Sequence, residues 1–175
     1  HFLSSVTQQY AGIFAQSFTS TTTVPTQSKN SPFVLVPLHY AYNALEPHID
    51  AQTMEIHHDR HHAAFVTNLN KLLADQPDLL KLEPTALVQQ IDKVPAAIRQ
   101  AVINNGGGHV NHSLFWQMMA PNAGGAPAGD VAKAIDAAFS NLDGFKQKFT
   151  EAAMGRFGSG WAWLSLDAGK KLIIE

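Results

Sequence analysis

Residues 50–73 decide the fold, and they read DAQTMEIHHDRHHAAFVTNLNKLL. Asp50 is suited to cap the N-terminus of a helix that runs to about Leu73. Within this stretch, apolar and histidine side chains recur at spacings of three and four, so one face of the helix is expected to be buried. That face consists of Met54, His57, His61, Phe65 and Leu69.

Helical patterns and then alternating patterns follow this first helix. Pro84 and Pro95 are each placed to begin a helix, the second of them long enough to pack antiparallel to the first. The fold class is therefore α+β, with a long helical hairpin followed by the start of an α/β domain of helices and antiparallel strands. The expected helices are 84–92, 95–119, 131–139 and 142–157, and the expected strands are 161–166 and 171–174.

Composition divides the chain into three parts. Residues 1–31 are rich in Ser and Thr and read as a flexible tail or a targeting remnant, which indicates export or an organelle, with the cytoplasm as the alternative. Residues 32–121 form the hairpin domain, and residues 122–175 form an incomplete C-terminal α/β domain. Because the sequence ends inside the second strand, the natural protein is expected to continue.

Bulk composition excludes several classes of protein. A net charge of -2 argues against a nucleic-acid partner, and the sequence has no cysteine, which excludes disulfides, Cys-zinc sites and Cys nucleophiles. No apolar run reaches the roughly 20 residues of a transmembrane segment. The nine histidines are the unusual feature, and most of them lie between His39 and His112.

The densest group of histidines is His57-His58-Asp59-Arg60-His61-His62. Residues four apart share a helix face, so His57 pairs with His61, and His58 pairs with His62 about 100° round the helix. The apolar stripe favours His57 and His61 as the inward pair, with His58 and His62 more exposed. Solvated or structurally satisfied pairs, and a generic zinc site, are the alternatives.

A second group, residues 104–116, reads NNGGGHVNHSLFW. His112 and Trp116 share a helix face, and two neutral imidazoles on facing helices suit a transition metal in a bundle. The three glycines at 106–108 indicate either a bend, a close approach by another element, or a break in the helix. In the third group, residues 156–163, Trp161 and Trp163 alternate along a strand, which is typical of core packing or of a dry wall beside a metal.

Together, residues 50–62, 104–116 and 157–163 resemble the iron/manganese superoxide dismutases in order, spacing and residue type. The resemblance extends over about residues 33–175 and implies one metal ion per subunit, held by His57 and His112 and by an Asp and a His beyond residue 175. It implies redox cycling with superoxide as substrate, and a homodimer or higher homo-oligomer. It also implies a surrounding shell of residues, namely His61, Phe65, Gly108, Trp116, Trp161 and Trp163.

Two positions bear on the metal and its access. Gly108 stands where the iron types of that family carry Gln, so the resemblance implies manganese, with iron as the alternative. Phe65 stands where the family usually has Tyr, which puts the hydrogen-bonded water chain of the substrate channel in doubt. With only two ligands in residues 1–175, this segment alone is expected to lack dismutase activity. The competing hypothesis is a non-catalytic helical hairpin that binds metal weakly or only dimerises.

Overall fold

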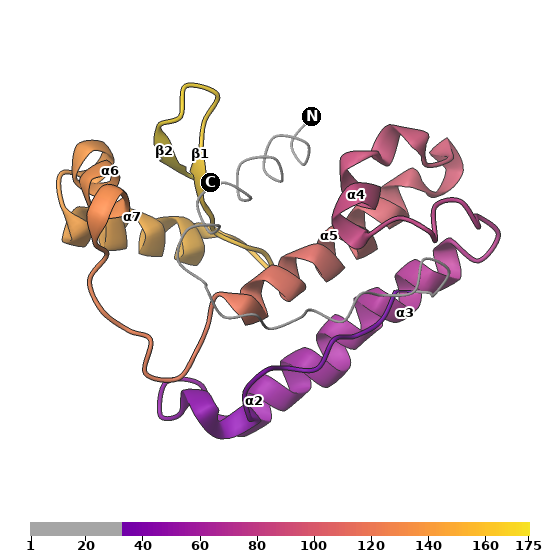
Figure 1. Cartoon of the computed structure of the whole chain (residues 1–175), viewed down its shortest axis with the longest axis horizontal. Helices are drawn as coiled ribbons and strands as arrows, with labels where there is room; N and C mark the ends of the chain where they lie inside the picture. Colours follow the sequence, from indigo (N-terminus) through magenta and orange to yellow (C-terminus); the bar gives the residue numbers. More distant parts are fainter. Residues whose placement is uncertain (1–32) are drawn as a thin grey trace. The chain divides into compact units, whose positions relative to one another are not determined.

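The computed structural model describes residues 33–175, and the tail expected at residues 1–31 lies outside them (Figure 1). Two compact units make up the described chain, one ending at Ala123 and the other running from Gly124 to Glu175. The candidate histidines all belong to the first unit.

The first long helix is continuous from α2 (Ala51–Ile56) through η2 (His57–His62) to α3 (Ala63–Leu72). The carboxylate of Asp50 accepts a hydrogen bond of 2.8 Å from the backbone N–H of Thr53, so Asp50 is the expected N-cap. Only η2 departs from α-helical geometry: it is a π-helical turn, in which the N–H of Ala63 bonds to the carbonyl of His58, five residues before it.

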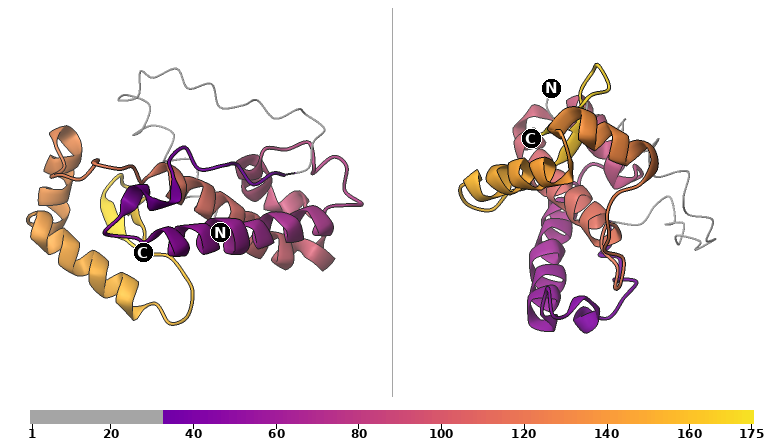
Figure 2. Two further views of the ribbon diagram at one scale, coloured as in Figure 1. Left: turned by 90° about the horizontal axis from the view of Figure 1, so that it is seen from below. Right: turned by 90° about the vertical axis from the view of Figure 1, so that its left-hand side faces the viewer.

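The second long helix, α5 (Ala96–Gln117), begins directly after Pro95 and returns along the first. Between them lie α4 (Pro84–Gln89), with Pro84 in its first turn, and the short 3-10 turn η3 (Ile91–Lys93). α3 and α5 pack side by side and antiparallel, as both views show (Figures 1 and 2). The hairpin expected from the sequence is therefore confirmed.

Apart from the histidines, a compact apolar core stabilises this hairpin. Leu69 and Leu73 from the first helix meet Val102 from α5, and all three side chains have an exposed fraction of 0%. Burying a side chain of this size contributes about 1.5–3 kcal/mol to stability. The other buried members of the core are Phe33, Val66, Leu79, Leu87 and Val94.

In the second unit, two helices pack against a two-stranded antiparallel sheet. Helix α6 (Gly129–Phe139) is followed by α7 (Leu142–Gly155), whose first turn is capped by the side chain of Asn141, 2.8 Å from the N–H of Gly144. The strands are β1 (Leu164–Leu166) and β2 (Leu172–Ile174), paired with Ser165 opposite Ile173. Both strands are shorter than expected, and α7 ends two residues before the predicted Phe157.

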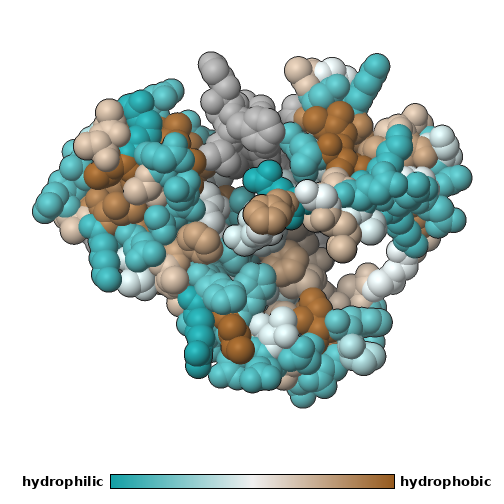
Figure 3. All heavy atoms as spheres, turned by 180° about the vertical axis from the view of Figure 1, so that it is seen from behind, coloured by the Kyte–Doolittle hydropathy of each residue, from teal (hydrophilic) through white to brown (hydrophobic). Residues whose placement is uncertain are grey.

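The described residues thus form an α+β protein, as the sequence predicts. Hydrophilic side chains cover most of the face drawn in Figure 3, and hydrophobic ones gather in separate patches. Within residues 33–175, no helix has the length and apolar character needed to cross a membrane. Exposed large apolar side chains include Met154 (82%) and Phe157 (100%), both in the second unit.

Candidate metal centre

Two histidines from different helices converge where η2 faces α5. His57 is the first residue of η2, His112 lies on α5, and their Nε2 atoms are 3.0 Å apart. Two metal–imidazole bonds of about 2.1 Å each can span at most about 4.2 Å. The expected approach of these two nitrogens is therefore confirmed, and their separation suits binding to a single ion.

The hydrogen bond at Nδ1 of His112 leaves Nε2 of the neutral ring without a proton. Its Nδ1 lies 2.7 Å from the carbonyl oxygen of Gly108, which can only accept, so Nδ1 carries the proton. In the neutral ring, Nε2 then presents a lone pair toward His57. A metal ligand held through its second nitrogen by a backbone carbonyl is the usual arrangement for histidine.

Electrostatics keep this pair neutral. Burial, reinforced by the neighbouring His112, lowers the pKa of His57 to about 4. Burial likewise lowers the pKa of His112, although its hydrogen bond to Gly108 acts in the opposite direction. Both imidazoles are consequently neutral near pH 7, which is the state a metal ion requires.

Aromatic rings surround the two histidines. The ring centre of Trp116 lies 5.0 Å from that of His57, and the ring centre of Phe65 lies 5.2 Å from that of His112. His61 lies 5.8 Å from His57, but its side chain is exposed. The structure therefore brings Phe65, Trp116 and His61 to the pair, with the first two covering it.

Gly108 lies tightly against the ring of Phe65 on the facing helix. A Cβ added there would lie only 2.5 Å from a ring carbon of Phe65, which no side chain tolerates without a shift of that ring. At Gly106 the same atom would make ordinary contacts of 3.5 Å with Val88 and 3.7 Å with Leu69. α5 runs unbroken through the three glycines, so the close approach is confirmed and the break is wrong.

The expected order of burial among the four histidines of η2 is wrong. His58 and His62 are 4% and 1% exposed, whereas His57 is half-buried and His61 is exposed. The physical reason is the π-turn, which is wider than an α-turn and moves the buried face on by one residue. The buried face therefore continues from Met54 through His58 and His62 instead of through His57 and His61.

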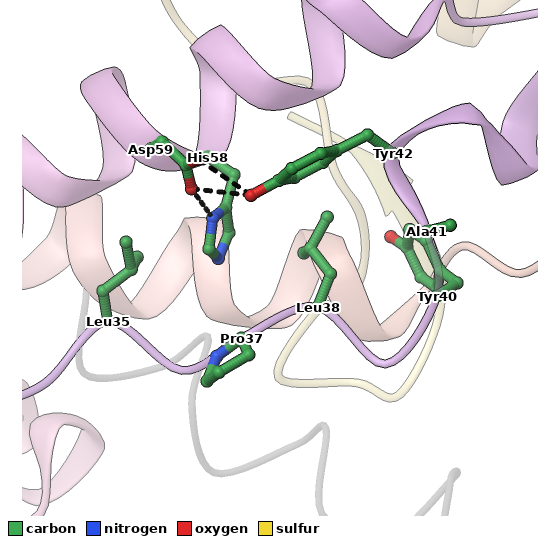
Figure 4. Close-up of a pocket in the computed structure, with 8 residues that line it drawn as sticks. All are labelled: Leu35, Pro37, Leu38, Tyr40, Ala41, Tyr42, His58 and Asp59. Carbon is green, nitrogen blue, oxygen red and sulfur yellow. Dashed lines mark hydrogen bonds and ion pairs between the residues drawn. The ribbon is translucent and has the colours of Figure 1, made fainter.

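His58 is buried against the segment that leads into the first helix. Its Nε2 lies 2.9 Å from the carbonyl of Val36, and its Nδ1 lies 2.6 Å from the carboxylate of Asp59 (Figure 4). The hydroxyl of Tyr42 donates to the same carboxylate at 2.8 Å. These bonds, His58 first, lower the pKa of Asp59, and the bond to Asp59 raises the pKa of Tyr42.

Tyr42, His58 and Asp59 line one side of a surface cavity of about 470 Å³. Its other side is the lead-in segment, whose side chains face them in Figure 4. His58 therefore faces this cavity and has oxygen partners at both ring nitrogens. The lining residues from the lead-in are Leu35, Pro37, Leu38, Tyr40 and Ala41.

A second cross-helix pair, His62 and His109, was missed from the sequence. Nε2 of His62 lies 2.7 Å from Nδ1 of His109, and both side chains are almost fully buried, at 1% and 2% exposed. Burial lowers the pKa of His62 to about 3 and that of His109 to about 4. Antiparallel geometry was the available signal, because residues after His57 on one helix face residues before His112 on the other.

The remaining predicted residues lie in the second unit. Trp161 and Trp163 stack on one another with ring centres 5.5 Å apart and an interplanar angle of 27°, and both are half-buried. Their place beside the histidines stays a prediction. Among residues 33–175, no three His, Cys, Asp or Glu side chains are grouped so as to hold a metal ion.

Sequence comparisons identify relatives for both units. Residues 32–120 match the alpha-hairpin domain of iron/manganese superoxide dismutases, and residues 127–175 match the C-terminal domain of that family. Over 148 residues the chain is 57% identical to superoxide dismutase [Mn] 1 of Leptolyngbya boryana, covering 85% of this chain and 60% of that protein.

Two other relatives are covered to a greater extent. The chain is 54% identical to superoxide dismutase [Mn/Fe] of Methylomonas sp. (strain J) and 55% identical to superoxide dismutase [Mn] of Thermus aquaticus. Each match covers 82% of this chain and 70% of the relative. The chain therefore spans between 60% and 70% of the length of these three curated relatives.

Proposed function

Because the chain belongs to the iron/manganese superoxide dismutases, we propose that the complete protein removes superoxide with one manganese ion per subunit. Iron is the alternative metal. The bound ion would supply one-electron chemistry, by which one superoxide is oxidised to dioxygen and another, with two protons, is reduced to hydrogen peroxide. His57 and His112 would be two of the protein ligands, and the family pattern would complete the set with an Asp and a His beyond residue 175.

One observation carries this proposal: the Nε2 atoms of His57 and His112 are 3.0 Å apart. Two neutral imidazoles in contact have little reason to converge in this way unless their lone pairs share an ion or one proton. The carbonyl of Gly108 fixes the proton of His112 on the far nitrogen. The pair is thus arranged to bind a cation.

The surrounding residues have separate tasks in this proposal. The carbonyl of Gly108 orients the ring of His112, while Trp116 and Phe65 keep bulk water away from the two ligands. His61 lies at the exposed edge, where a proton can be exchanged with solvent or with a second subunit. Trp161 and Trp163 would complete the apolar wall from the second unit.

The choice of manganese rests on Gly108. The iron types place Gln at this position, and here a side chain at 108 would fit only if the ring of Phe65 shifted, because an added Cβ would lie 2.5 Å from that ring. Two of the relatives above are named for manganese alone and one for manganese or iron. Metal analysis, with activity after reconstitution by each ion, tests the choice, and activity with iron alone would reject it.

We also propose that the complete protein is a homodimer or a higher homo-oligomer. The exposed position of His61 beside the pair supports a subunit contact at this face. Light scattering of the purified complete protein measures its mass directly. A monomer at micromolar concentration would reject this part of the proposal.

Superoxide removal by the complete, manganese-loaded protein tests the function itself. We expect wild-type activity to fall by more than about a hundredfold in His112→Ala, since loss of a ligand exceeds the 10–100-fold cost of losing a residue that only supports one. His48→Ala is a matched control, because His48 is an exposed histidine that lies outside both η2 and α5. An inactive wild-type protein that still folds and dimerises would favour the non-catalytic hairpin.

A further inference from the structure

The buried pair His62 and His109 has a definite direction of hydrogen bonding. The indole Nε1 of Trp116 lies 3.0 Å from Nδ1 of His62 and can only donate. Nδ1 of His62 must therefore accept, so the proton of this neutral ring sits on Nε2. That proton is then donated across 2.7 Å to Nδ1 of His109, which accepts in turn.

The neighbouring serine leaves this order undisturbed. The hydroxyl of Ser113 lies 2.9 Å from the carbonyl oxygen of His109, to which it donates, and 3.5 Å from Nδ1 of the same residue. Since the stronger bond goes to the carbonyl, Nδ1 of His109 stays available to His62. The chain from Trp116 through His62 to His109 accordingly has one tautomer at each ring and no competing arrangement.

The hydrogen-bonded series Trp116–His62–His109 contacts both His57 and His112. The ring of His62 stacks on that of His112 with centres 5.1 Å apart and an interplanar angle of 17°. Trp116, held by His62, has its ring centre 5.0 Å from that of His57. His62 also joins the two helices, because it lies on η2 and both of its hydrogen-bond partners lie on α5.

We propose that His62 and His109 are positioning residues of the metal centre, which fix the Trp116 ring against His57 and the His112 ring against His62 through a single directional chain of hydrogen bonds. This inference rests on the proposed function, since it assigns the pair a task toward the ion that His57 and His112 hold. The pair does not bind the ion itself. Its two facing nitrogens are already occupied by the proton they share.

Substitutions at His62 separate the two hydrogen bonds. His62→Asn keeps an acceptor near the position of Nδ1 for Trp116, His62→Gln keeps a donor near the position of Nε2 for His109, and His62→Leu removes both. In the complete protein, we expect manganese affinity, measured by chelator competition, to fall about 10–100-fold in His62→Leu. His62→Asn should be closest to wild type, because it alone keeps Trp116 in place.

Leu73→Ala is the control for a merely structural role. Leu73, which caps the C-terminal end of α3, is fully buried in the apolar core, so its truncation lowers stability through a cavity in that core. We expect Leu73→Ala to leave manganese affinity within twofold of wild type. Equal losses of affinity in Leu73→Ala and His62→Leu, or unchanged affinity in all three His62 variants, would overturn the positioning role.

Nitrogen-15 NMR of the metal-free complete protein reads the tautomers directly. We expect protonated Nε2 and unprotonated Nδ1 on both His62 and His109, with the indole N–H of Trp116 shifted by its hydrogen bond in wild type and His62→Asn but not in His62→Leu. A proton on Nδ1 of His62 would overturn the proposed chain. A wild-type protein that shows these tautomers yet binds no manganese would instead refute the proposed function, and the metal-positioning role with it.

Discussion

Two imidazole pairs cross between the same two helices, and they differ in almost everything except residue type. His57 and His112 face each other at 3.0 Å, with His57 only half-buried, whereas His62 and His109 face each other at 2.7 Å and are almost fully buried. An indole N–H sets the proton order in the buried pair, and a backbone carbonyl sets it in the other.

The difference shows that hydrogen-bond partners, not the motif, decide what each histidine can do. The partners of His62 leave none of its ring nitrogens for a metal, while the Gly108 carbonyl that bonds Nδ1 of His112 leaves the Nε2 atom of that ring facing His57. We therefore propose that the ion binds to His57 and His112, and that His62 and His109 support the site. The predictions below test that division.

The largest expected effect comes from His57→Ala. In the complete protein this change should reduce manganese affinity by more than about a hundredfold, because a ligand is lost. The free energy of unfolding of the metal-free protein should change by less than about 1 kcal/mol, since the ring is half-buried. Chelator competition and urea denaturation measure the two quantities.

His62→Leu should show the opposite balance: a loss of about 1–3 kcal/mol in stability, because Trp116 and His109 are left without their partner. Similar profiles for His57→Ala and His62→Leu would mean that the two pairs do not have separate tasks.

The next effect concerns the glycines beside the ligand pair. Gly108→Ala should destabilise the protein by about 1–3 kcal/mol, because the new Cβ meets the ring of Phe65. Gly107→Ala is the matched control and should be neutral or stabilising by up to about 1 kcal/mol, since nothing lies within 4 Å of its added Cβ. Thermal denaturation measures both.

A second substitution checks the cause. Adding Phe65→Leu to Gly108→Ala should recover part of the lost stability by removing the ring that the methyl group strikes. If Gly107→Ala and Gly108→Ala have equal effects, the close approach of the helices is not what requires glycine at 108.

Acid should weaken the metal-free fold in a window defined by the histidines. The folded pKa values of His57 and His109 are about 4 and that of His62 is about 3, all below the ordinary 6.5, so the folded state favours the neutral rings. Their contribution is complete above pH 6.5 and is lost as the pH falls toward 4. The loss is at most about 1.4 kcal/mol per pH unit for each ring.

Carboxylates do not account for this window. Asp50 and Asp59 have pKa values lowered below 3.8 by their hydrogen bonds, so their contribution is lost only at still lower pH. Urea denaturation at pH 7, 5.5 and 4.5 should show a falling free energy of unfolding, with a shallower slope in His62→Leu. A free energy of unfolding that stays constant across these three pH values would contradict the neutral, buried state of His62 and His109.

The smallest expected effect is that of Asp59→Asn. Asp59 is exposed although it bonds to His58 and Tyr42, so the change should cost no more than about 1 kcal/mol. Manganese affinity should stay within twofold of wild type. A larger loss of affinity would show that the His58 side of η2 also supports the metal centre.

Much of this molecule follows from local sequence rules. The N-cap at Asp50, the helix starts at Pro84 and after Pro95, and the capping by Asn141 all depend on residues within one turn of the feature they create. The pairing of His57 with His112 came through the resemblance to a family. The distance between their Nε2 atoms could be obtained only from the structure.

The face of the first helix could not be read from an ideal period. A π-turn at His57–His62 shifts the buried positions by one residue, and nothing in the spacing of Met54, Phe65 and Leu69 announces it. The pairing of His62 with His109 was within reach, because antiparallel helices that bring 57 to 112 also bring 62 near 109. Its proton order depends on Trp116, which only tertiary structure places there.

The most direct test of the account is a crystal of the manganese-loaded complete protein measured at the manganese absorption edge. We predict one anomalous peak per subunit, about 2.1 Å from Nε2 of both His57 and His112, with no peak between His62 and His109. A peak that contacts His62 or His109, or one that lies away from His57 and His112, would contradict the division of tasks between the two pairs.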